Sequence, residues 1–463
     1  MAVSPEHVPG EVVQLPGGIT SIDHRFTLPL RWTCPSSDAT ITVFARELVL
    51  GRNAKDQNLP MCIFLQGGPG FPSPRTMGPG GWVGRALKDF RVLLLDQRGT
   101  GKSTPVTAAG MALMESPEAQ AEYLGHFRSD NIVSDCEAIR KMLLADPNDS
   151  EAAPKKWTVL GQSYGGFCLA TYLSRHPDAI EAGLFTGGLP PLRDVDEIYR
   201  ATYRRCAERN RRYYARYPGD VSKVKSILQF LAEQPRGGMP LPGGGLLTPR
   251  RFLQLGLMLG GSAGMESLHY MVDEAWEQGG ALAYCFLRAV ENAQAFDTNP
   301  IYTLLHEPIY MWDGAAAAPR WSAQRVLEAD AAVAAAFDWR GAVNGGSAPA
   351  YFTGEMVYRW MLDGDYAQLE GLKGAAELLA ERTEWTVLYD KDALSKCQVP
   401  CAAAVYYDDM YVEREFSEEL AQLMPDCKIW VTNEYQHSGL RDDGAIIFEK
   451  LLGMTRNEVM VPS

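Results

Sequence analysis

The sequence has little that would suit a nucleic-acid or membrane protein. Its 44 lysines and arginines are outnumbered by 57 aspartates and glutamates, which gives a net charge of −13. Clustered positive charge favours binding to a phosphate backbone or an anionic lipid surface, so we expect neither nucleic acid nor membrane as a partner. The chain has no run of about 18 uninterrupted apolar residues, so the sequence predicts no transmembrane helix.

Signals for export and for metal binding are also missing. Residues 1–7 contain neither a basic segment nor an apolar run of signal-peptide length. The nine cysteines are odd in number and scattered, and no second Cys or His pair completes a zinc pattern with Cys397 and Cys401. We therefore expect a cytoplasmic protein with reduced thiols and no bound metal.

Short apolar segments alternate with helical patterns in the first part of the chain. Segments 24–31 and 40–50 predict an antiparallel hairpin, with a turn at 34–38 between them. Buried strands are predicted at 61–65, 91–95 and 157–160, and helices at 129–145 and 167–175. This alternation predicts an α/β fold with a mostly parallel, doubly wound sheet.

The character of the sequence changes near residue 190. Residues 195–385 carry helical patterns and many aromatics, with almost no signal for buried strands. Strand patterns return at 400–407 and 428–431. We therefore expect the first part of a core domain at 1–190, an inserted helical cap at 191–385 and the second part of the core at 386–463.

Residues 161–165 read Gly-Gln-Ser-Tyr-Gly and lie between a predicted strand and a predicted helix. In this context G-x-S-x-G forms the nucleophile elbow of the α/β-hydrolase fold, where small residues permit a sharp turn. The start of the following helix favours developing negative charge. Ser163 is therefore the predicted nucleophile. A Gly-Ser loop arising by chance is the alternative, and the flanking strand and helix argue against it.

A serine nucleophile needs a base, and α/β-hydrolases carry serine, acid and histidine in that order along the chain. Of seven histidines, only His437 follows the resumed sheet, so it is the predicted base. The acid should end the strand before it, where Asp408 and Asp409 follow one another. We take Asp408, the first carboxylate after the strand, and keep Asp409 as the alternative.

An oxyanion hole requires two backbone N–H donors. Tyr164 follows the nucleophile and is predicted to provide one of them. The second donor is predicted from Gly67 or Gly68, in a Gly-rich loop directly after the strand at 61–65. The alternative reading of this loop is a tight turn without a catalytic role.

Three segments taken together resemble the proline iminopeptidases, also called prolyl aminopeptidases. They are Gly67-Gly68-Pro69-Gly70, Asp96-Gln97-Arg98-Gly99-Thr100-Gly101-Lys102-Ser103 and Gly161–Gly166. The family's loop reads H-G-G-P-G and its second motif D-Q-R-G-x-G-x-S. Here Gln66 replaces the usual His and Tyr164 the frequent Trp, and both changes leave the backbone donors intact. The long insertion is similar to the longer form of the family.

The resemblance implies a serine aminopeptidase that releases an N-terminal residue, preferentially proline, through an acyl-enzyme and without a cofactor. Its partners would be short peptides with a free N-terminus. Glu307 lies in a segment similar to the family's E-x-x-Y cap motif, and Glu355 resembles the second cap glutamate, so both are implied to bind the substrate ammonium. The aromatic residues expected to wall an apolar pocket are Tyr302, Tyr310, Tyr351, Phe352 and Trp360.

For Asp96 and Arg98 we predict a structural role and no part in a chemical step. We expect the two to pair beneath the active site and hold the oxyanion loop. Two other functions stay open for the whole chain. One is an esterase or amidase acting on small esters or amino-acid amides, and the other is a catalytically silent binding protein. The oligomeric state and the strictness of the proline preference stay open as well.

Overall fold

The computed structural model describes residues 4–33, 39–56, 58–146, 149, 152–315 and 317–459. Its centre is a nine-stranded sheet with the order β1-β2-β3-β5-β4-β6-β7-β10-β11. The strands are β1 (Glu6–Leu15), β2 (Ile19–Pro29), β3 (Thr40–Leu50), β4 (Met61–Leu65), β5 (Arg91–Asp96), β6 (Trp157–Gln162), β7 (Ile180–Thr186), β10 (Cys401–Tyr406) and β11 (Cys427–Thr432). Pairing is antiparallel from β1 through β3 to β5 and parallel from β5 to β11. The predicted α/β class with a mostly parallel sheet is confirmed.

The predicted opening hairpin corresponds to β2 and β3. These strands pair in register from Ile19 with Leu50 to Pro29 with Thr40. The predicted turn at 34–38 lies outside the described residues. Two strands of the sheet, β1 and β7, have no counterpart in the prediction.

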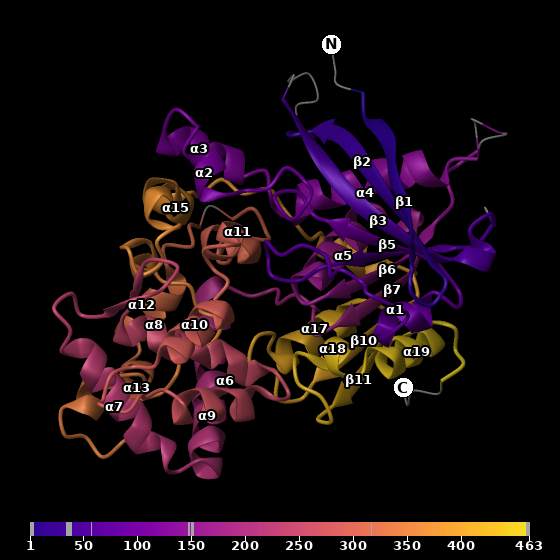
Figure 1. Cartoon of the computed structure of the whole chain (residues 1–463). Coiled ribbons are helices and arrows are strands. Elements are labelled where there is room, and N and C mark those ends of the chain that lie inside the picture. The colour runs from indigo at the N-terminus through magenta and orange to yellow at the C-terminus, as the bar shows by residue number, and fades with distance from the viewer. Residues whose placement is uncertain are drawn as a thin grey trace.

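The core helices cover both faces of the sheet (Figure 1). They are α1 (Gly81–Ala86), α4 (Ser129–Leu144), α5 (Tyr164–Arg175), α16 (Lys391–Ser395), α17 (Arg414–Leu423), α18 (Gly439–Asp442) and α19 (Gly444–Thr455). Helices α2 (Ala108–Met111) and α3 (Pro117–Leu124) lie away from the sheet, and α3 contacts α15 (Lys373–Glu381). Successive residues of β4 face opposite sides, as the strand period of two requires. Ile63 and Leu65 pack with residues of α4 and α5, whereas Cys62 and Phe64 pack with residues of α1 and α19. The central strands are therefore buried on both faces, which explains their continuous apolar sequence.

Helices dominate the chain between β7 and β10. They are α6 (Val195–Arg216), α7 (Asp220–Ala232), α8 (Pro249–Leu253), α9 (Gly264–Asp273), α10 (Tyr284–Ala293), α11 (Pro300–Leu305), α12 (Ser322–Ala329), α13 (Ala331–Ala336), α14 (Trp339–Val343) and α15 (Lys373–Glu381). The short strands β8 (Met239–Pro240) and β9 (Leu246–Leu247) pair with each other. Figure 1 shows α6 to α10, α12 and α13 gathered beside the sheet, and we call residues between β7 and α16 the cap. The boundaries predicted at 190 and 385 stay predictions, and both fall between elements.

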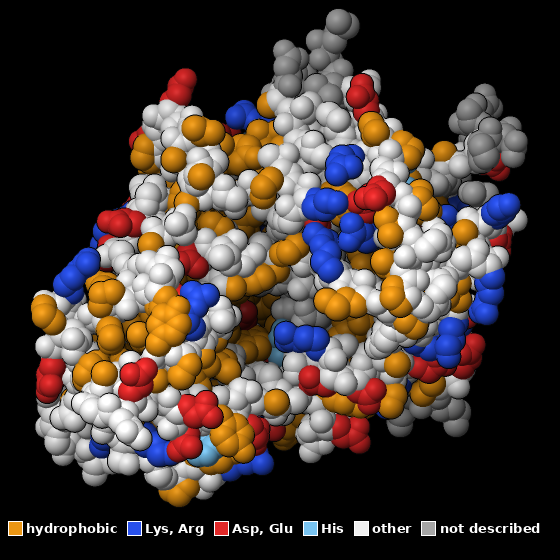
Figure 2. All heavy atoms as spheres, viewed as in Figure 1, with side chains coloured by type: hydrophobic (Ala, Val, Ile, Leu, Met, Phe, Trp, Pro, Cys, Tyr) orange, Lys and Arg blue, Asp and Glu red, His pale blue; other side chains and the backbone are white. Residues whose placement is uncertain are grey.

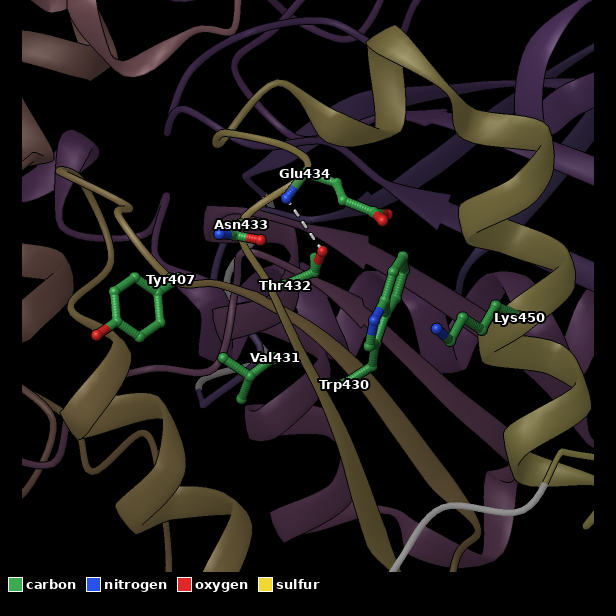
Figure 3. A pocket seen from close by; sticks show the side chains of 7 residues that line it. All are labelled: Tyr407, Trp430, Val431, Thr432, Asn433, Glu434 and Lys450. Atoms are coloured by element: carbon green, nitrogen blue, oxygen red, sulfur yellow. Dashed lines mark hydrogen bonds between the residues drawn. The ribbon is translucent and has the colours of Figure 1, made fainter.

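Strand β11 forms one edge of the sheet. A pocket of about 360 Å³ lies against it, lined by Tyr407, Trp430, Val431, Thr432, Asn433, Glu434 and Lys450 (Figure 3). Nζ of Lys450 lies 3.7 Å from the centroid of the Trp430 ring, so the ring and the ammonium partly cover this edge.

Two features of the described residues concern the expected setting of the protein. None of the helices there is both long enough and apolar enough to cross a bilayer. The eight cysteines in the described ranges are all free thiols. Seven of these thiols are buried or half-buried, and Cys285 is exposed.

Candidate active site

Ser163 stands at the turn between β6 and α5. Its φ of +53° is strained for a residue with a Cβ, as the elbow geometry requires. A Cβ on Gly161 would lie 2.5 Å from the carbonyl oxygen of Gly165, and one on Gly165 would collide with the carbonyl of Leu65. The amide of Ser163 donates to the carbonyl oxygen of Thr186 at 3.0 Å. The two glycines of the motif are therefore needed sterically, and the neighbouring strand β7 fixes the turn.

His437 is oriented by a buried carboxylate. Its Nδ1 lies 2.7 Å from Oδ2 of Asp409, and both side chains are buried. Oδ1 of Asp409 accepts the amides of Tyr411 at 2.9 Å and Val412 at 3.2 Å. Burial disfavours the charged imidazolium, but Asp409 outweighs it through its charge and hydrogen bond, so the pKa of His437 is raised. The other ring nitrogen, Nε2, is thereby left to act as a base.

The prediction of Asp408 as the partner of His437 is wrong. Strand β10 ends at Tyr406, and the turn after it directs the Asp408 carboxylate to Arg212 of the cap, with Oδ2 2.7 Å from Nη1. The amide of Asp409 donates to the carbonyl of Tyr406 at 3.2 Å, and this turn brings the second carboxylate inward. The alternative kept from the sequence, Asp409, is the residue that contacts His437.

Two glycines after β7 lie against both Ser163 and His437. A Cβ on Gly187, which has a φ of +54°, would stand 3.1 Å from Nδ1 of His437. A Cβ on Gly188 would stand 2.5 Å from the carbonyl oxygen of Ser163. Because consecutive residues touch the nucleophile and the imidazole, the end of β7 brings the two together. The sequence analysis missed these glycines because it did not predict β7.

The Gly-rich loop after β4 lies directly beside Ser163. A Cβ on Gly67 would stand 2.7 Å from Cβ of Ser163, so only glycine permits this approach. Gly68 has a φ of +131° and precedes Pro69 through a cis peptide bond. Tyr164 opens α5, and the first amides of a helix have no carbonyl partner within it. These positions suit the predicted oxyanion donors Gly67, Gly68 and Tyr164, whose role stays a prediction.

Asp96 and Arg98 do not pair with each other as expected. Asp96 accepts two hydrogen bonds from Arg75, at 2.9 and 2.5 Å, and one from the amide of Ser73 at 3.1 Å. Arg98 instead pairs with Asp135 of α4, with Nη2 2.6 Å from Oδ1. Asp96 therefore secures the segment that follows the Gly-rich loop, and Arg98 ties the same turn to a core helix.

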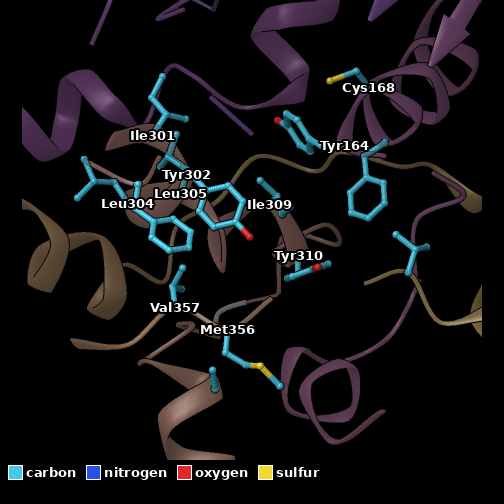
Figure 4. Packing of buried hydrophobic residues seen from close by; sticks show 14 of the residues in the cluster. Tyr164, Cys168, Ile301, Tyr302, Leu304, Leu305, Ile309, Tyr310, Met356 and Val357 are labelled. Atoms are coloured by element: carbon cyan, nitrogen blue, oxygen red, sulfur yellow. The ribbon is translucent and has the colours of Figure 1, made fainter. Parts of the chain in front are cut away.

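Glu355 of the cap interacts electrostatically with His437. Burial raises its pKa to about 7, while the charge of His437 and a hydrogen bond from Tyr302 lower it. The Tyr302 hydroxyl donates to Oε1 of Glu355 at 3.1 Å. Figure 4 shows this hydroxyl directed toward Tyr310. The site thus combines a carboxylate with two tyrosines, and Figure 2 shows the surface hollowed between the cap and the sheet.

Glu307 is more deeply buried and has a structural contact. Its Oε1 accepts the amide of Ala323 at 3.0 Å, at the start of α12. Burial raises its pKa to about 8, although these first-turn amides of α12 lower it. The five aromatic residues expected to wall one pocket do not gather in one place. Trp360 stacks on Tyr358 and lines a separate cap pocket, and Phe352 packs against Tyr213 and Phe252 inside the cap.

Comparison with known proteins agrees with this geometry. A family model described as the alpha/beta hydrolase fold matches residues 62–222. The proline iminopeptidase of Aeromonas sobria is 43% identical over 95% of this chain and 97% of its own. The chain belongs to the proline iminopeptidase family. A second member, proline iminopeptidase aneH of Aspergillus aculeatus, is 33% identical over 99% of this chain and 100% of its own.

Among solved structures, the proline iminopeptidase of Mycobacterium smegmatis aligns over 94% of this chain and 99% of its own. The identity is 13% and the TM-score 0.41.

The two departures from the proline iminopeptidase motifs leave the site intact. Gln66 replaces the family's usual histidine, and its backbone carbonyl accepts Nε2 of Gln97 at 3.1 Å. Because this contact uses the backbone, it does not depend on the side chain at position 66. The side chain of Tyr164 is buried with its ring edge against Phe167, so it packs in the core beside the elbow.

Tyr411 contacts the imidazole of His437 and was not among the predicted site residues. The ring of Tyr411 meets His437 edge-on at 4.6 Å between centroids, and its hydroxyl donates to the carbonyl of Leu257. Tyr411 thereby connects the base to the cap. Its only sequence signal is that it follows Asp409 by two residues. In the described residues, no group of three His, Cys, Asp or Glu side chains is arranged to hold a metal ion.

Proposed function

We propose that this chain is a serine aminopeptidase that releases the N-terminal residue of peptides, preferentially proline. Membership of the proline iminopeptidase family supports the substrate class. The observation that carries the proposal is Glu355, a half-buried carboxylate that accepts a hydrogen bond from Tyr302 and acts electrostatically on His437. An anion held next to a catalytic base is unfavourable unless a cation joins it, and a free peptide N-terminus provides that cation.

Substrate selection follows from this charge. The ammonium or imino group of the first residue pairs with Glu355, and Glu307 adds a second negative charge when it is ionised. A bound cation would shift both raised pKa values back toward the ordinary range, because it favours the carboxylate form. An internal peptide nitrogen carries no charge and would leave Glu355 without a cationic partner. Cleavage would therefore be restricted to the first peptide bond.

Chemistry then proceeds by acyl transfer. Ser163 Oγ attacks the first carbonyl carbon while Nε2 of His437 takes its proton, and Asp409 stabilises the resulting imidazolium. The amides of Tyr164 and of Gly67 or Gly68 stabilise the oxyanion. His437 then returns the proton to the leaving amine as the C–N bond breaks. A water molecule hydrolyses the ester on Ser163, again with His437 as base, and frees the amino acid.

The test compares proline β-naphthylamide with its N-acetylated counterpart and a p-nitrophenyl ester. We expect fast cleavage of the free-amine substrate and none of the blocked one. Cleavage of the ester alone would overturn the aminopeptidase proposal in favour of an esterase. The Ser163→Ala variant should fold normally and lose activity toward both proline β-naphthylamide and the ester. A folded protein without activity toward any of the three would indicate a silent binding protein.

A further inference from the structure

Tyr411 contacts both the acid and the base of the site. Its amide donates to Oδ1 of Asp409 at 2.9 Å, and its ring lies nearly perpendicular to the imidazole of His437, with 4.6 Å between the centroids. The other oxygen of Asp409, Oδ2, is the one that pairs with Nδ1 of His437. One residue therefore holds the carboxylate through its backbone and limits the movement of the imidazole through its side chain.

The far end of the Tyr411 side chain is held by the cap. Its hydroxyl donates to the carbonyl oxygen of Leu257. A Cβ on Gly260 would collide with this ring, and the three atoms nearest to that Cβ all belong to Tyr411. The φ of Gly260 is not positive, so the glycine is needed there for space and not for its backbone conformation. The cap thus fixes the tyrosine by one hydrogen bond and by close packing.

The same stretch of the cap also bonds the loop that carries His437. The amide of Ser262 donates at 3.0 Å to Oγ of Ser438, the residue after the base. Within the cap, Nε and Nη2 of the buried Arg209 both donate to the carbonyl oxygen of Leu259, at 3.0 and 2.8 Å. This stretch is therefore fixed inside the cap, and it is bonded to the loop after β10 as well as to the loop after β11.

We propose that Tyr411 is a positioning residue, through which the cap holds Asp409 and His437 in the geometry that proton transfer requires. The inference rests on the proposed function, of which it uses only the acyl-transfer step. A displacement of about 1 Å at a reacting group can lower the rate on the order of 10²-fold. The cap then has two tasks, since it also carries Glu355, the residue proposed to bind the substrate amine.

The contact between His437 and Asp409 gives this role a measurable signature. Burial and the charge of Arg441 lower the pKa of His437, whereas Asp409 and Glu355 raise it, with a net rise. A hydrogen bond weakens steeply with distance and angle, so an imidazole that is held less firmly loses part of the contribution of Asp409. Release of Tyr411 from the cap should therefore lower the pKa of His437. A tyrosine that only stabilises the fold would leave this pKa unchanged.

The first experiment compares Tyr411→Phe with the control Tyr214→Phe. Tyr214 is a buried cap residue whose hydroxyl donates to the carbonyl of Ala350 at 2.6 Å, so each variant loses one bond from a tyrosine to the backbone. In Tyr411→Phe, kcat should fall about 3- to 10-fold on both proline β-naphthylamide and the p-nitrophenyl ester, with KM little changed. The pKa of His437, measured by NMR on protein isotope-labelled at histidine Cε1, should fall as well. Tyr214→Phe should change neither kcat nor this pKa.

The second experiment changes the cap alone. In Gly260→Ala the new Cβ must displace the Tyr411 ring, whereas in the control Gly261→Ala the nearest atom is 3.6 Å away. We expect Gly260→Ala to lower kcat at least about tenfold on both substrates and to lower the pKa of His437, and Gly261→Ala to change neither. An unchanged pKa of His437 in both Tyr411→Phe and Gly260→Ala would overturn the inference.

The NMR titration needs no turnover, so it tests the role of Tyr411 whatever the substrate of the protein is. Failure of the aminopeptidase proposal appears separately, as no cleavage of proline β-naphthylamide by the natural protein. If Gly260→Ala does not fold, Tyr411→Phe still decides, because it removes a single oxygen and adds no atom. A loss of kcat confined to proline β-naphthylamide would also contradict the inference, since His437 acts as base on both substrates.

Discussion

Nδ1 of His437 lies 2.7 Å from Oδ2 of Asp409, and solvent is nearly excluded from both side chains. The other oxygen of Asp409 is held by the amides of Tyr411 and Val412. With the carboxylate fixed by the backbone, the imidazole has one orientation and one neutral tautomer, with the proton on Nδ1. The neighbouring carboxylate, Asp408, is equally close in sequence but pairs with Arg212.

This arrangement predicts different outcomes for two adjacent substitutions. Asp409→Asn should lower kcat by up to about 10⁴-fold, because the amide stabilises the wrong tautomer and no longer stabilises the imidazolium. Asp408→Asn removes only a partly exposed ion pair and should change kcat less than about threefold. Steady-state kinetics on proline β-naphthylamide distinguish the two. A larger loss from Asp408→Asn would contradict the assignment.

A second prediction concerns Glu355. Glu355→Gln should raise KM for proline β-naphthylamide about 10- to 100-fold, the contribution of a charge-assisted hydrogen bond, and leave KM for a p-nitrophenyl ester nearly unchanged. The negative charge of Glu355 raises the pKa of His437, so its removal should also shift the acidic limb of ester hydrolysis to lower pH. The control is Glu370→Gln, an exposed cap residue. An equal rise of KM on both substrates would contradict the role as an amine anchor.

Glu307 leads to a prediction about stability. Its pKa is about 8 in the fold against an ordinary value of 4.5, so the folded state binds this proton more tightly than the unfolded state. The resulting stabilisation is complete below about pH 4.5 and is lost as the pH rises toward 8. Glu307→Gln cannot ionise and keeps an oxygen for the Ala323 amide. Its advantage in the free energy of unfolding over the natural protein should grow by on the order of 4 kcal/mol from pH 5 to pH 8.5, and its advantage in Tm should grow with it. A difference independent of pH would contradict this account.

The sequence was sufficient to predict the site residues that depend on motif and chain order. Ser163 and His437 follow from a turn that needs glycines and from the position of the histidine after the last strand. The choice between Asp408 and Asp409 required a strand end known to one residue, because consecutive residues in the turn point in opposite directions. Sequence patterns do not locate strand ends that sharply. The contact with Arg212, which draws Asp408 away, joins parts of the chain far apart in sequence.

The elements that were missed have specific reasons. Strand β1 is an exposed edge strand, so it lacks the alternation that burial of one face imposes. Strand β7 is interrupted by Gly183, and a glycine weakens a strand pattern. Glu307 and Glu355 carry no signal of their own, since an isolated glutamate is ordinarily a solvated residue. Only their resemblance to the family's cap motifs singled them out. Their surroundings depend on how the cap folds onto the core, which a sequence pattern does not show.

The glycine that follows β7 gives a further prediction. Gly187 has a φ of +54°, and an added Cβ would stand 3.1 Å from both Nδ1 of His437 and Cε2 of Tyr406. In Gly187→Ala the imidazole must therefore shift by a few tenths of an ångström, and the left-handed backbone costs about 1–2 kcal/mol more. We expect kcat to fall at least about tenfold with KM little changed, because displacement of the base affects proton transfer more than binding. The control Gly219→Ala has a φ of −65° and no atom within 4 Å of the new Cβ. If Gly187→Ala lowered only Tm and left kcat intact, β7 would support the fold without positioning His437.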